Sequence, residues 1–379
     1  MKFAFVIFKY FPFGGAQRDM MRIAQASVRR GHEVHIFTQA WDGPQPQTDI
    51  SVHTMPGAGW PNFRRYRDFI RQVQAAIAEI GFDFVVGFNR LPGLGAYFAA
   101  DPCFVERAHA RWGNFYRLSA RYRFFADCEK AVFAPDSGCE ILLLSPAEKA
   151  EFQRWYTTPD ARFHLLPPFI SPERFVLQDP AQVRASVREE FGFGADDALL
   201  LMVGSGFKTK GLDRAIQALA ALPQHLRDRT RLLAVGQDNP RFFMKMAKRL
   251  GVSDHVVVVA GRNDVPRLMQ GADLLVHPAY RENTGLVLLE AGACGLPVLA
   301  SDVCGYAFHI RQAESGKLIA SPFSQQQFNQ QMEYMLTSAN REPWSQNGKC
   351  YANALMQAND GSAEAEMIEN FARRKVGTA

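Results

Sequence analysis

The stretch FAFVIFKYFPFGGAQRDMMRIAQASVRRGHEVHIFT, residues 3–38, decides the fold class. Its opening apolar run predicts a buried β-strand, and the glycine pair that follows predicts a turn. Over residues 17–30, Met21, Ala24 and Val28 recur at helical spacing, and a further glycine ends the helix before a second short apolar run. Strand, turn, helix and strand in this order are the opening βαβ unit of a parallel, doubly wound α/β sheet.

The same pattern begins again in the second half of the chain. Residues 199–203 are apolar, residues 204–211 form a loop with glycines and lysines, and residues 212–222 have helical spacing. Further short apolar runs, separated by helical segments, lie at residues 232–235, 255–260, 274–277 and 298–300. The chain therefore contains two successive α/β units.

These two units predict two domains, residues 1–168 and 169–361, which meet at a proline pair suited to an extended linker. A ligand site is expected in a cleft between them. Residues 362–379 predict a polar helix that can pack back on the first domain.

Composition excludes several classes of protein. Of 379 residues, 43 are Lys or Arg and 38 are Asp or Glu, which gives a net charge of +5. The apolar and charged fractions are those of a globular chain rather than a disordered or fibrous one. The basic excess lies mainly in residues 1–170, where 20 basic residues stand against 16 acidic ones, and it indicates an anionic partner for this half. The six cysteines show no C-x-x-C spacing, so neither a disulfide framework nor a zinc site is expected.

No segment of the sequence is long and apolar enough to span a membrane. Lys9 interrupts the first apolar run and no cleavage site follows, so a buried strand is a better interpretation than a signal peptide. The longest apolar stretch, residues 286–300, contains Glu290 and two glycines. We therefore expect a cytoplasmic protein that can still touch a membrane surface.

The most specific motif is RENTGLVLLE, residues 281–290. Glu282 follows a predicted strand, and Glu290 lies two turns inside a helix that is apolar on nearly every side. A buried carboxylate needs hydrogen-bond donors, which either the hydroxyls of a sugar or an arginine can supply. The free backbone N–H groups at the start of this helix suit a phosphate. The pattern alone does not decide whether Glu290 belongs to a ligand site or to a structural ion pair.

This motif resembles the E-x7-E signature of the family 4 glycosyltransferases, which have the GT-B fold of two Rossmann-like domains facing a cleft. The spacing of the two Glu residues and the Gly-Leu-Pro-Val at residues 295–298 carry the resemblance. It implies that Glu282 binds the donor sugar and that Glu290 binds the nucleotide ribose. It also implies donor contacts by the first four of the seven residues between them, Asn283, Thr284, Gly285 and Leu286.

The loop GSGFKTKG, residues 204–211, presents two lysines after a strand. It has neither the G-K-S/T ending of a P-loop nor the G-x-G-x-x-G of a dinucleotide site. Such a loop suits a pyrophosphate, although lysines of this kind are more often solvated. The resemblance implies that Lys210 neutralises the leaving diphosphate and that Lys208 replaces an arginine which relatives carry at the position of Thr209. Further donor contacts implied in the same way are Arg174, Arg262 and Asn263.

A second resemblance covers nearly the whole chain, from the first strand to at least residue 323. Four strings make the sequence similar to the lipopolysaccharide core glucosyltransferase I family: KYFPFGGAQRD (9–19), VGFN (86–89), FAAD (98–101) and CGYA (304–307). This resemblance implies an enzyme peripheral to the cytoplasmic face of the inner membrane. It implies transfer of glucose from UDP-glucose to the first branching heptose of the lipopolysaccharide inner core.

Three residues of the N-terminal half are further site candidates. A glycine between a first strand and a first helix lets the backbone approach a ligand, so Gly15 is expected to face the donor phosphates. Asp19 is either a carboxylate stabilised by the dipole of its helix or a group that faces the acceptor. Asp101 is the second acceptor candidate.

A basic and aromatic segment occupies residues 107–125. Phe115, Leu118, Tyr122 and Phe125 fall on one face of a predicted helix, away from the arginines. Such a segment suits an anionic membrane surface, and a solvated basic face is an equally good interpretation. Nucleic acid is not expected, because no recognised binding module is present. The membrane-surface candidates are Arg107, Arg111, Arg117, Arg121 and Arg123.

The chain contains no D-x-D triplet, so no metal cofactor is expected. Negative charge on a departing UDP would then be met by side chains and by the backbone at Gly15 and Gly285. The family retains the anomeric configuration, and we favour front-face displacement in which the leaving phosphate helps to deprotonate the acceptor. A carboxylate nucleophile does not stand out, although Asp19 stays open. The catalytic candidates are Asp19, Lys210, Arg262 and Glu282.

Asn283 and Thr284 bear on the identity of the donor, because relatives that use glucose carry two small apolar residues there. The pair either caps the following helix or binds an extra substituent such as an N-acetyl group. UDP-glucose is the first donor expected and a UDP-N-acetylhexosamine the second. The rival functions are a sugar-nucleotide epimerase, a phosphorylase and a non-catalytic anionic-lipid-binding module. The last of these has no reason to carry Lys210, Glu282 and Glu290.

Overall fold

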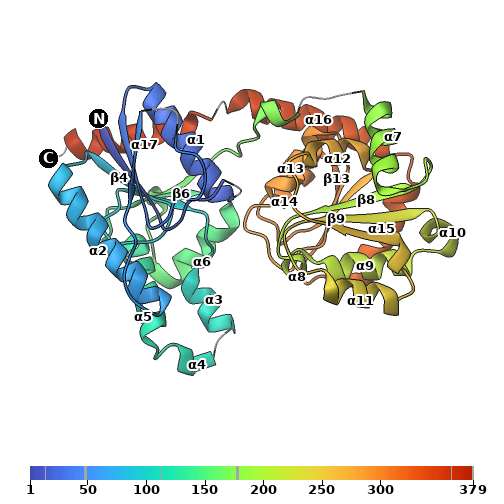
Figure 1. Cartoon of the computed structure of the whole chain (residues 1–379), viewed down its shortest axis with the longest axis horizontal. Coiled ribbons are helices and arrows are strands. Elements are labelled where there is room, and N and C mark those ends of the chain that lie inside the picture. The colour runs from blue at the N-terminus through green and yellow to red at the C-terminus, as the bar shows by residue number, and fades with distance from the viewer. Residues whose placement is uncertain (13, 47–48, 112, 176–178, 360, 378–379) are drawn as a thin grey trace. The chain divides into compact units, whose positions relative to one another are not determined.

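The computed structural model describes residues 1–12, 14–46, 49–111, 113–175, 179–359 and 361–377, with the backbone alone at 111, 113, 114, 147, 173, 174 and 376. The chain divides into two compact units. Unit 1 comprises Met1–Pro167 and Asn359–Ala379, and unit 2 comprises Pro168–Ala358. Each unit is a parallel β-sheet with helices packed around it (Figure 1). The expected α/β class, with two doubly wound Rossmann-like units, is confirmed.

The sheet of unit 1 has seven strands within the described residues, in the order β3-β2-β1-β4-β5-β6-β7, and each pair is parallel. The strands are β1 Lys2–Ile7, β2 Glu33–Thr38, β3 Ile50–Thr54, β4 Phe84–Gly87, β5 Ala96–Ala99, β6 Glu140–Leu143 and β7 Phe163–Leu165. The chain runs from β1 outward to β2 and β3, and then returns to place β4 on the other side of β1. This reversal opens a crevice at the carboxyl ends of β1 and β4, where open α/β sheets bind ligands.

Alternation of side chains along β1 divides the core of unit 1 between the two faces of the sheet. Phe3 and Phe5 lie in one buried cluster, with residues of the first and last helices of the chain. Ala4 and Val6 lie in the other. A strand that is covered on both faces has a continuous apolar sequence, and this is why β1 can be predicted from the sequence.

The helices of unit 1 include one that the chain supplies from its far end. They are α1 Gly15–Arg29, α2 Asn62–Ile80, α3 Phe104–Arg111, α4 Gly113–Tyr116, α5 Ala120–Phe133, α6 Pro146–Tyr156, the 3-10 turn η1 Asp160–Arg162 and α17 Ala363–Gly377. α17 packs against α1 (Figure 1). Ion pairs join Arg22 to Glu364 and Arg30 to Glu369, each at 2.7 Å, and Phe371 enters the core.

The sheet of unit 2 has six strands within the described residues, in the order β10-β9-β8-β11-β12-β13. The strands are β8 Ala198–Val203, β9 Thr230–Val235, β10 Val256–Val259, β11 Leu274–His277, β12 Val298–Ser301 and β13 Gly316–Ile319. Its helices are α7 Pro180–Phe191, α8 Phe207–Lys210, α9 Leu212–Ala221, α10 Gln224–Arg227, α11 Arg241–Arg249, α12 Val265–Gly271, α13 Leu286–Ala293, α14 Ala307–Ala313, α15 Gln325–Thr337 and α16 Arg341–Ala358, with 3-10 turns η2 Pro172–Phe175 and η3 Ser253–His255. The reversal of strand order here lies between β8 and β11.

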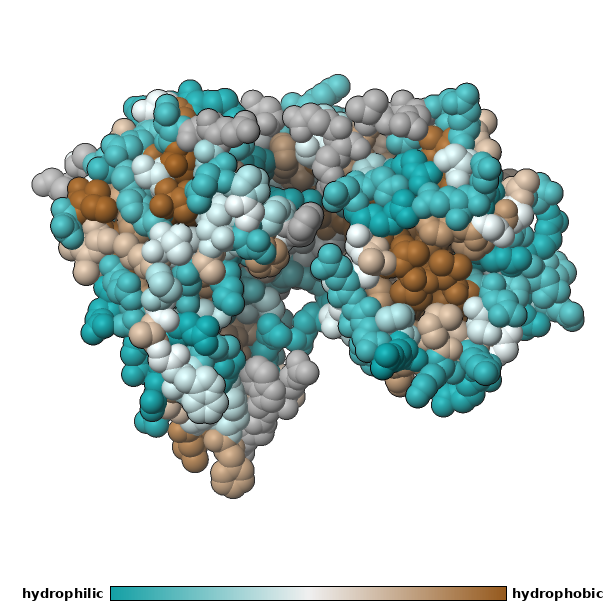
Figure 2. Space-filling model, in the orientation of Figure 1, coloured by the Kyte–Doolittle hydropathy of each residue, from teal (hydrophilic) through white to brown (hydrophobic). Residues whose placement is uncertain are grey.

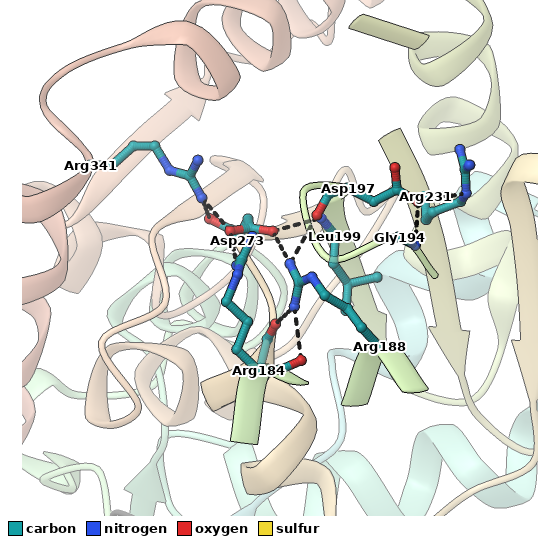
Figure 3. A network of polar contacts seen from close by, with 9 residues as sticks. Arg184, Arg188, Gly194, Asp197, Leu199, Arg231, Asp273 and Arg341 are labelled. Carbon is teal, nitrogen blue, oxygen red and sulfur yellow. Dashed lines mark hydrogen bonds and ion pairs between the residues drawn. The ribbon is translucent and has the colours of Figure 1, made fainter. Parts of the chain in front are cut away.

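A buried carboxylate with three arginine partners joins the elements of unit 2 (Figure 3). Asp273 precedes β11 and accepts hydrogen bonds from Arg184 at 2.5 Å, Arg188 at 2.8 Å and Arg341 at 2.7 Å. It also accepts a hydrogen bond of 2.7 Å from the backbone N–H of Leu199. Burial alone would raise the pKa of Asp273, but these donors lower it. The cluster thus fixes α7 and α16 to the centre of the sheet.

Candidate active site

Glu282 lies just beyond the carboxyl end of β11, beside a histidine. His277 ends β11 and is fully buried, and its Nε2 atom lies 3.1 Å from Oε2 of Glu282. The ammonium of Lys210 forms an ion pair with the same oxygen. Burial by itself would raise the pKa of Glu282, but the hydrogen bond with His277 and the charge of Lys210 lower it to about 2. Glu282 is therefore an ionised carboxylate at neutral pH and can accept hydrogen bonds from hydroxyl groups.

Glycines in the loop after β8 bring Lys210 to this carboxylate. Gly211 has φ +84°, and a Cβ there would lie 2.1 Å from the carbonyl oxygen of Pro278. The loop and the end of β11 therefore meet at backbone distance, which only glycine permits. The carbonyl of Thr209 also accepts a hydrogen bond of 2.8 Å from the backbone N–H of Tyr280. Residues separated by about 70 positions in the sequence form one site by this close approach.

Lys208 lies in the same loop but has other partners. Its ammonium is 2.5 Å from Asp213 and 3.3 Å from the hydroxyl of Tyr280. The hydrogen bond with Asp213 raises the pKa of Lys208. The guanidinium of Arg214 lies 3.5 Å from the ring centroid of Tyr280. The ammonium of Lys208 also lies over this ring, 4.7 Å from the centroid. The structure therefore places Lys208 in a cation–aromatic cluster next to Lys210 rather than on Glu282.

Arg262 is held by carboxylates. It makes two hydrogen bonds to Asp264, at 2.7 and 2.8 Å, and one of 2.6 Å to Glu190. The hydrogen bonds to Asp264 are the main reason that the pKa of Arg262 is raised. Asn263 next to it is exposed. The side chain of Arg174 lies outside the described residues. To bind a phosphate, Arg262 would have to exchange one of these carboxylates for it.

The E-x7-E helix, α13, begins without a side-chain cap. Its N-cap is Gly285 at φ +81°, so the interpretation that Thr284 caps this helix is wrong. The backbone carbonyl of Thr284 accepts a hydrogen bond of 2.6 Å from the backbone N–H of Tyr306. Glu290 is half-buried rather than enclosed, and so are Asn283 and Leu286. The uncapped N–H groups of α13 suit an anion.

In unit 1, Asp19 belongs to the contact between the first and last helices. It lies 3.3 Å from Arg22, which is itself bound by Glu364 of α17. Burial raises the pKa of Asp19, and Arg22 opposes this shift. Gly15 begins α1, and a Cβ there would meet nothing within 4 Å. The open space at Gly15 leaves room for a ligand, whereas Asp19 has a structural partner.

Asp101 lines a cavity of about 290 Å³ in unit 1. The cavity lies at the carboxyl ends of β1, β4 and β5, at the reversal of strand order. Lys9 and Asn89 also line it, and the sequence analysis names neither of them as a site residue. A signal existed, because each polar residue follows directly on an apolar run that predicts a strand. His277 was missed in the same way, at the last position of its strand.

The basic and aromatic segment is not one helix. Ser119 is the N-cap of a new helix, α5, because its hydroxyl accepts a hydrogen bond of 3.1 Å from the backbone N–H of Tyr122. The predicted continuous apolar face is therefore wrong, because the chain turns between α4 and α5. Phe115 is 89% exposed and Leu118 is 73% exposed. Figure 2 shows apolar colour at the tip of unit 1 where Figure 1 places α4.

The five arginines of this segment differ in their surroundings. Arg117, Arg121 and Arg123 are in or next to this turn; Arg121 lies over the ring of Phe125 and Arg123 is 3.4 Å from a carbonyl oxygen at residue 118. Arg107 is half-buried, and the side chain of Arg111 lies outside the described residues. Three arginines therefore accompany the exposed apolar pair.

Two other kinds of site are absent from the described part of the chain. No group of three or more His, Cys, Asp or Glu side chains there could hold a metal ion. No helix there is long and apolar enough to cross a membrane.

Comparison with known proteins identifies the family. Residues 183–350 match the family described as glycosyl transferases group 1, and residues 13–174 match Glycosyltransferase Family 4. The chain is 45% identical over 351 residues to the lipopolysaccharide glucosyltransferase WaaG of Escherichia coli (strain K12), covering 92% of this chain and 94% of that protein. The chain belongs to glycosyltransferase family 4. It is accordingly an enzyme that transfers a sugar.

More distant relatives and solved structures agree with this assignment. This glycosyltransferase is 28% identical to a D-inositol 3-phosphate glycosyltransferase of Stackebrandtia nassauensis, over 81% of this chain and 75% of that one. It superposes on the crystal structure of WaaG with a TM-score of 0.88, at 44% identity and with 97% and 99% of the two chains covered. Anabaena HepE in complex with UDP-glucose gives a TM-score of 0.75 at 18% identity, covering 98% and 99%, which shows the fold alone. Two Rossmann-like units of this kind are the GT-B architecture.

Proposed function

We propose that this glycosyltransferase transfers glucose from UDP-glucose to an inner-core heptose of lipopolysaccharide, with retention of the anomeric configuration and without a metal ion. The observation that carries the proposal is the 45% identity to a lipopolysaccharide glucosyltransferase over 92% of the chain. The pairing of Lys210 with Glu282 at the end of β11 supports it. The resemblance to family 4 gives Lys210 the role of a cation for the diphosphate and Glu282 that of a carboxylate for the sugar, and we adopt both roles in this proposal.

The chemistry follows from the charges of the site. As the bond between the anomeric carbon and the β-phosphate oxygen breaks, negative charge grows on the departing UDP, and Lys210 with the free N–H groups after Gly285 would stabilise it. The acceptor oxygen bonds to the anomeric carbon on the same face, and its proton passes to the leaving phosphate. Glu282, ionised at neutral pH, would hold a hydroxyl of the transferred sugar. Glu290 would hold the ribose, and Asp19 or Asp101 the acceptor.

The ion pair between Lys210 and Glu282 must open when the donor binds. Lys210 and Glu282 neutralise each other in this structure. A donor that brings a diphosphate to Lys210 and a hydroxyl to Glu282 replaces one ion pair by two charge-assisted contacts, so neither group is left buried and unpaired.

The test is transfer by the purified full chain from radiolabelled UDP-glucose to core lipopolysaccharide, with and without excess EDTA. We expect acceptor-dependent transfer that EDTA leaves unchanged. Release of UDP without acceptor dependence would favour an epimerase or a hydrolase, and binding of anionic lipid without any turnover would favour the non-catalytic module. Loss of transfer in EDTA with rescue by magnesium or manganese would refute metal independence.

A UDP-N-acetylhexosamine is the second candidate donor, and one observation favours it. Gly285, not Thr284, is the N-cap of α13, so N-capping does not account for a threonine at residue 284. Asn283 and Thr284 are half-buried next to Glu282, where they could bind an extra substituent on the sugar.

We also propose that the turn between α4 and α5 rests on an anionic membrane surface. Exposed Phe115 and Leu118 can enter the lipid interface while the neighbouring arginines bind headgroups. Replacing Arg117, Arg121 and Arg123 together by Gln should reduce sedimentation with vesicles that contain phosphatidylglycerol, and should weaken its dependence on salt.

A matched variant separates this contact from general charge. Arg29, Arg64 and Arg71 are exposed on unit 1 outside this segment. Replacing them together by Gln removes the same net charge and should leave sedimentation unchanged. Equal loss in both triple variants would leave only a solvated basic surface.

A further inference from the structure

The cavity of unit 1 presents three polar side chains from adjacent strand ends. Lys9 follows β1, Asn89 follows β4 and Asp101 follows β5, and these strands are neighbours in the order β1-β4-β5. Neighbouring strands lie about 4.8 Å apart, so the outer two positions are separated by roughly 10 Å. The cavity therefore has a cation at one end, an amide in the middle and a carboxylate at the other end.

The backbone around Lys9 is fixed, although its ammonium has no partner among the described side chains. The backbone carbonyl of Lys9 accepts a hydrogen bond of 3.1 Å from the side-chain amide of Gln17. The backbone N–H of Phe8 donates a hydrogen bond of 2.7 Å to Oδ1 of Asn89. Tyr10 stacks on Trp41 with ring centroids 3.8 Å apart. No described carboxylate lies within ion-pair distance of Lys9. These contacts fix the backbone of Lys9 at the rim of the cavity, and its exposed ammonium is left available to a ligand there.

The opposite end of the cavity is supported from behind. Arg90 donates to the carbonyl oxygens of Asp101 and Pro102, at 2.5 and 2.7 Å. The same guanidinium lies 2.5 Å from Glu129, which is fully buried and accepts hydrogen bonds from the backbone at the start of α3. The turn that carries Asp101 is thus held in place, while its own carboxylate has no ion-pair partner within the described residues.

Two stacked aromatic rings form part of the remaining wall of the cavity, which Ile7, Ala16, Gln17, Phe88 and Ala100 complete. Phe8 and Tyr66 stack with centroids 4.2 Å apart and planes inclined by 11°, and both line the cavity. The C–H face of a pyranose packs on such a surface. Because Oδ1 of Asn89 is already used by the N–H of Phe8, its NH₂ group is left to donate. A volume of about 290 Å³ suits a single sugar residue with one substituent better than an extended chain.

We propose that this cavity binds an acidic sugar of the acceptor, and that Lys9 recognises an anionic substituent, a carboxylate or a phosphate ester. Asp101 and Asn89 then bind the hydroxyls, one as acceptor and one as donor, and the stacked rings support the apolar face of the sugar. This inference rests on the proposed function, because it specifies the acceptor that the function leaves open. It gives Lys9 the role of a specificity residue in unit 1, separate from the donor residues of unit 2.

The experiment measures binding by calorimetry between the full chain and delipidated inner-core oligosaccharide. Four forms of the oligosaccharide are compared: native, dephosphorylated, carboxyl-reduced, and both dephosphorylated and carboxyl-reduced. Lys9→Met should weaken binding of the native form roughly 10- to 100-fold, as the loss of one charge-assisted hydrogen bond does. Lys9→Arg should retain most of the affinity. The singly treated oligosaccharide on which the Lys9→Met effect disappears identifies the group that Lys9 binds.

Two controls keep the outcome decisive. Lys130 is an exposed lysine of the same unit outside the cavity, and Lys130→Met should bind every form as the parent does. UDP affinity should be unchanged by Lys9→Met, which shows that the donor site of unit 2 is intact, and an unchanged urea midpoint shows that unit 1 is folded as well. The inference is overturned if Lys9→Met behaves like Lys130→Met, if it weakens binding equally on the doubly treated form, or if the parent binds no form at all. Binding without any transfer would instead refute the proposed function and leave this assignment standing.

Discussion

Replacing Glu282 by Gln is expected to destabilise unit 2 by an amount that depends on pH. The pKa of Glu282 falls from its ordinary 4.5 to about 2 in the folded protein, and a tenfold change in an acid dissociation constant corresponds to about 1.4 kcal/mol. Ionised Glu282 therefore contributes roughly 3 kcal/mol at neutral pH. Its side chain is only 11% exposed, so solvent screens little of this. Because the folded pKa is the lower one, the contribution is present above about pH 4.5 and is lost as pH falls towards 2.

Urea unfolding of the parent and Glu282→Gln at several pH values between about 3 and 7 measures this difference. We expect the full difference from about pH 7 down to about pH 5 and about half of it at about pH 3. Glu333→Gln is the matched control, since Glu333 is exposed on α15 of the same unit, and it should show no such dependence. A difference between parent and Glu282→Gln that stays constant across this whole pH range would refute the assignment of Glu282 as a carboxylate ionised by Lys210 and His277.

The remaining predictions concern the donor site and the core of unit 2. Lys210→Ala should lower kcat by roughly two to three orders of magnitude in the transfer assay, as loss of a charge stabiliser does; an unchanged kcat would exclude Lys210 from the chemistry. Glu290→Ala should weaken UDP binding in calorimetry, and an unchanged affinity would rule out the ribose contact. Arg188→Met should cost about 3 kcal/mol in urea unfolding, because it removes a buried partner of a carboxylate, and a cost below about 1 kcal/mol would contradict this. Asn283→Ala with Thr284→Ala should change the donor ranking across a panel of UDP-sugars; an identical ranking would make both residues structural.

The sequence predicts the two sheets because their central strands are covered on both faces. β1 and β8 are continuous apolar runs, and the helices that follow them show clear periodicity. Shorter strands are harder to identify: β13 begins with Gly and Lys, and the four apolar residues of β5 are too few to tell a strand from part of a buried helix. Their position is decided by pairing with neighbours far along the chain, which local spacing does not encode.

The site was predictable to the extent that its members lie in recognisable loops. Lys210 and Glu282 are 72 positions apart, and their meeting depends on the close approach of Gly211 to the end of β11. The partners of Lys208 and Arg262 were not predictable, because Asp213, Asp264 and Glu190 are ordinary acidic residues until the fold brings them near. The same holds for Ser119, whose hydroxyl begins a helix inside a segment that otherwise has the spacing of a single one.

The return of the chain to unit 1 determines when that unit can be completed during synthesis. α17 covers the face of α1 with Ile368 and Phe371, and it follows all of unit 2 in the sequence. Unit 2 is therefore translated in full before this helix exists. Nascent unit 1 must keep an apolar face and the guanidinium of Arg22 uncovered until α17 has emerged. A protease or chaperone would meet this face only before α17 has docked, so the docking of α17 closes a surface by which unfinished chains can be recognised.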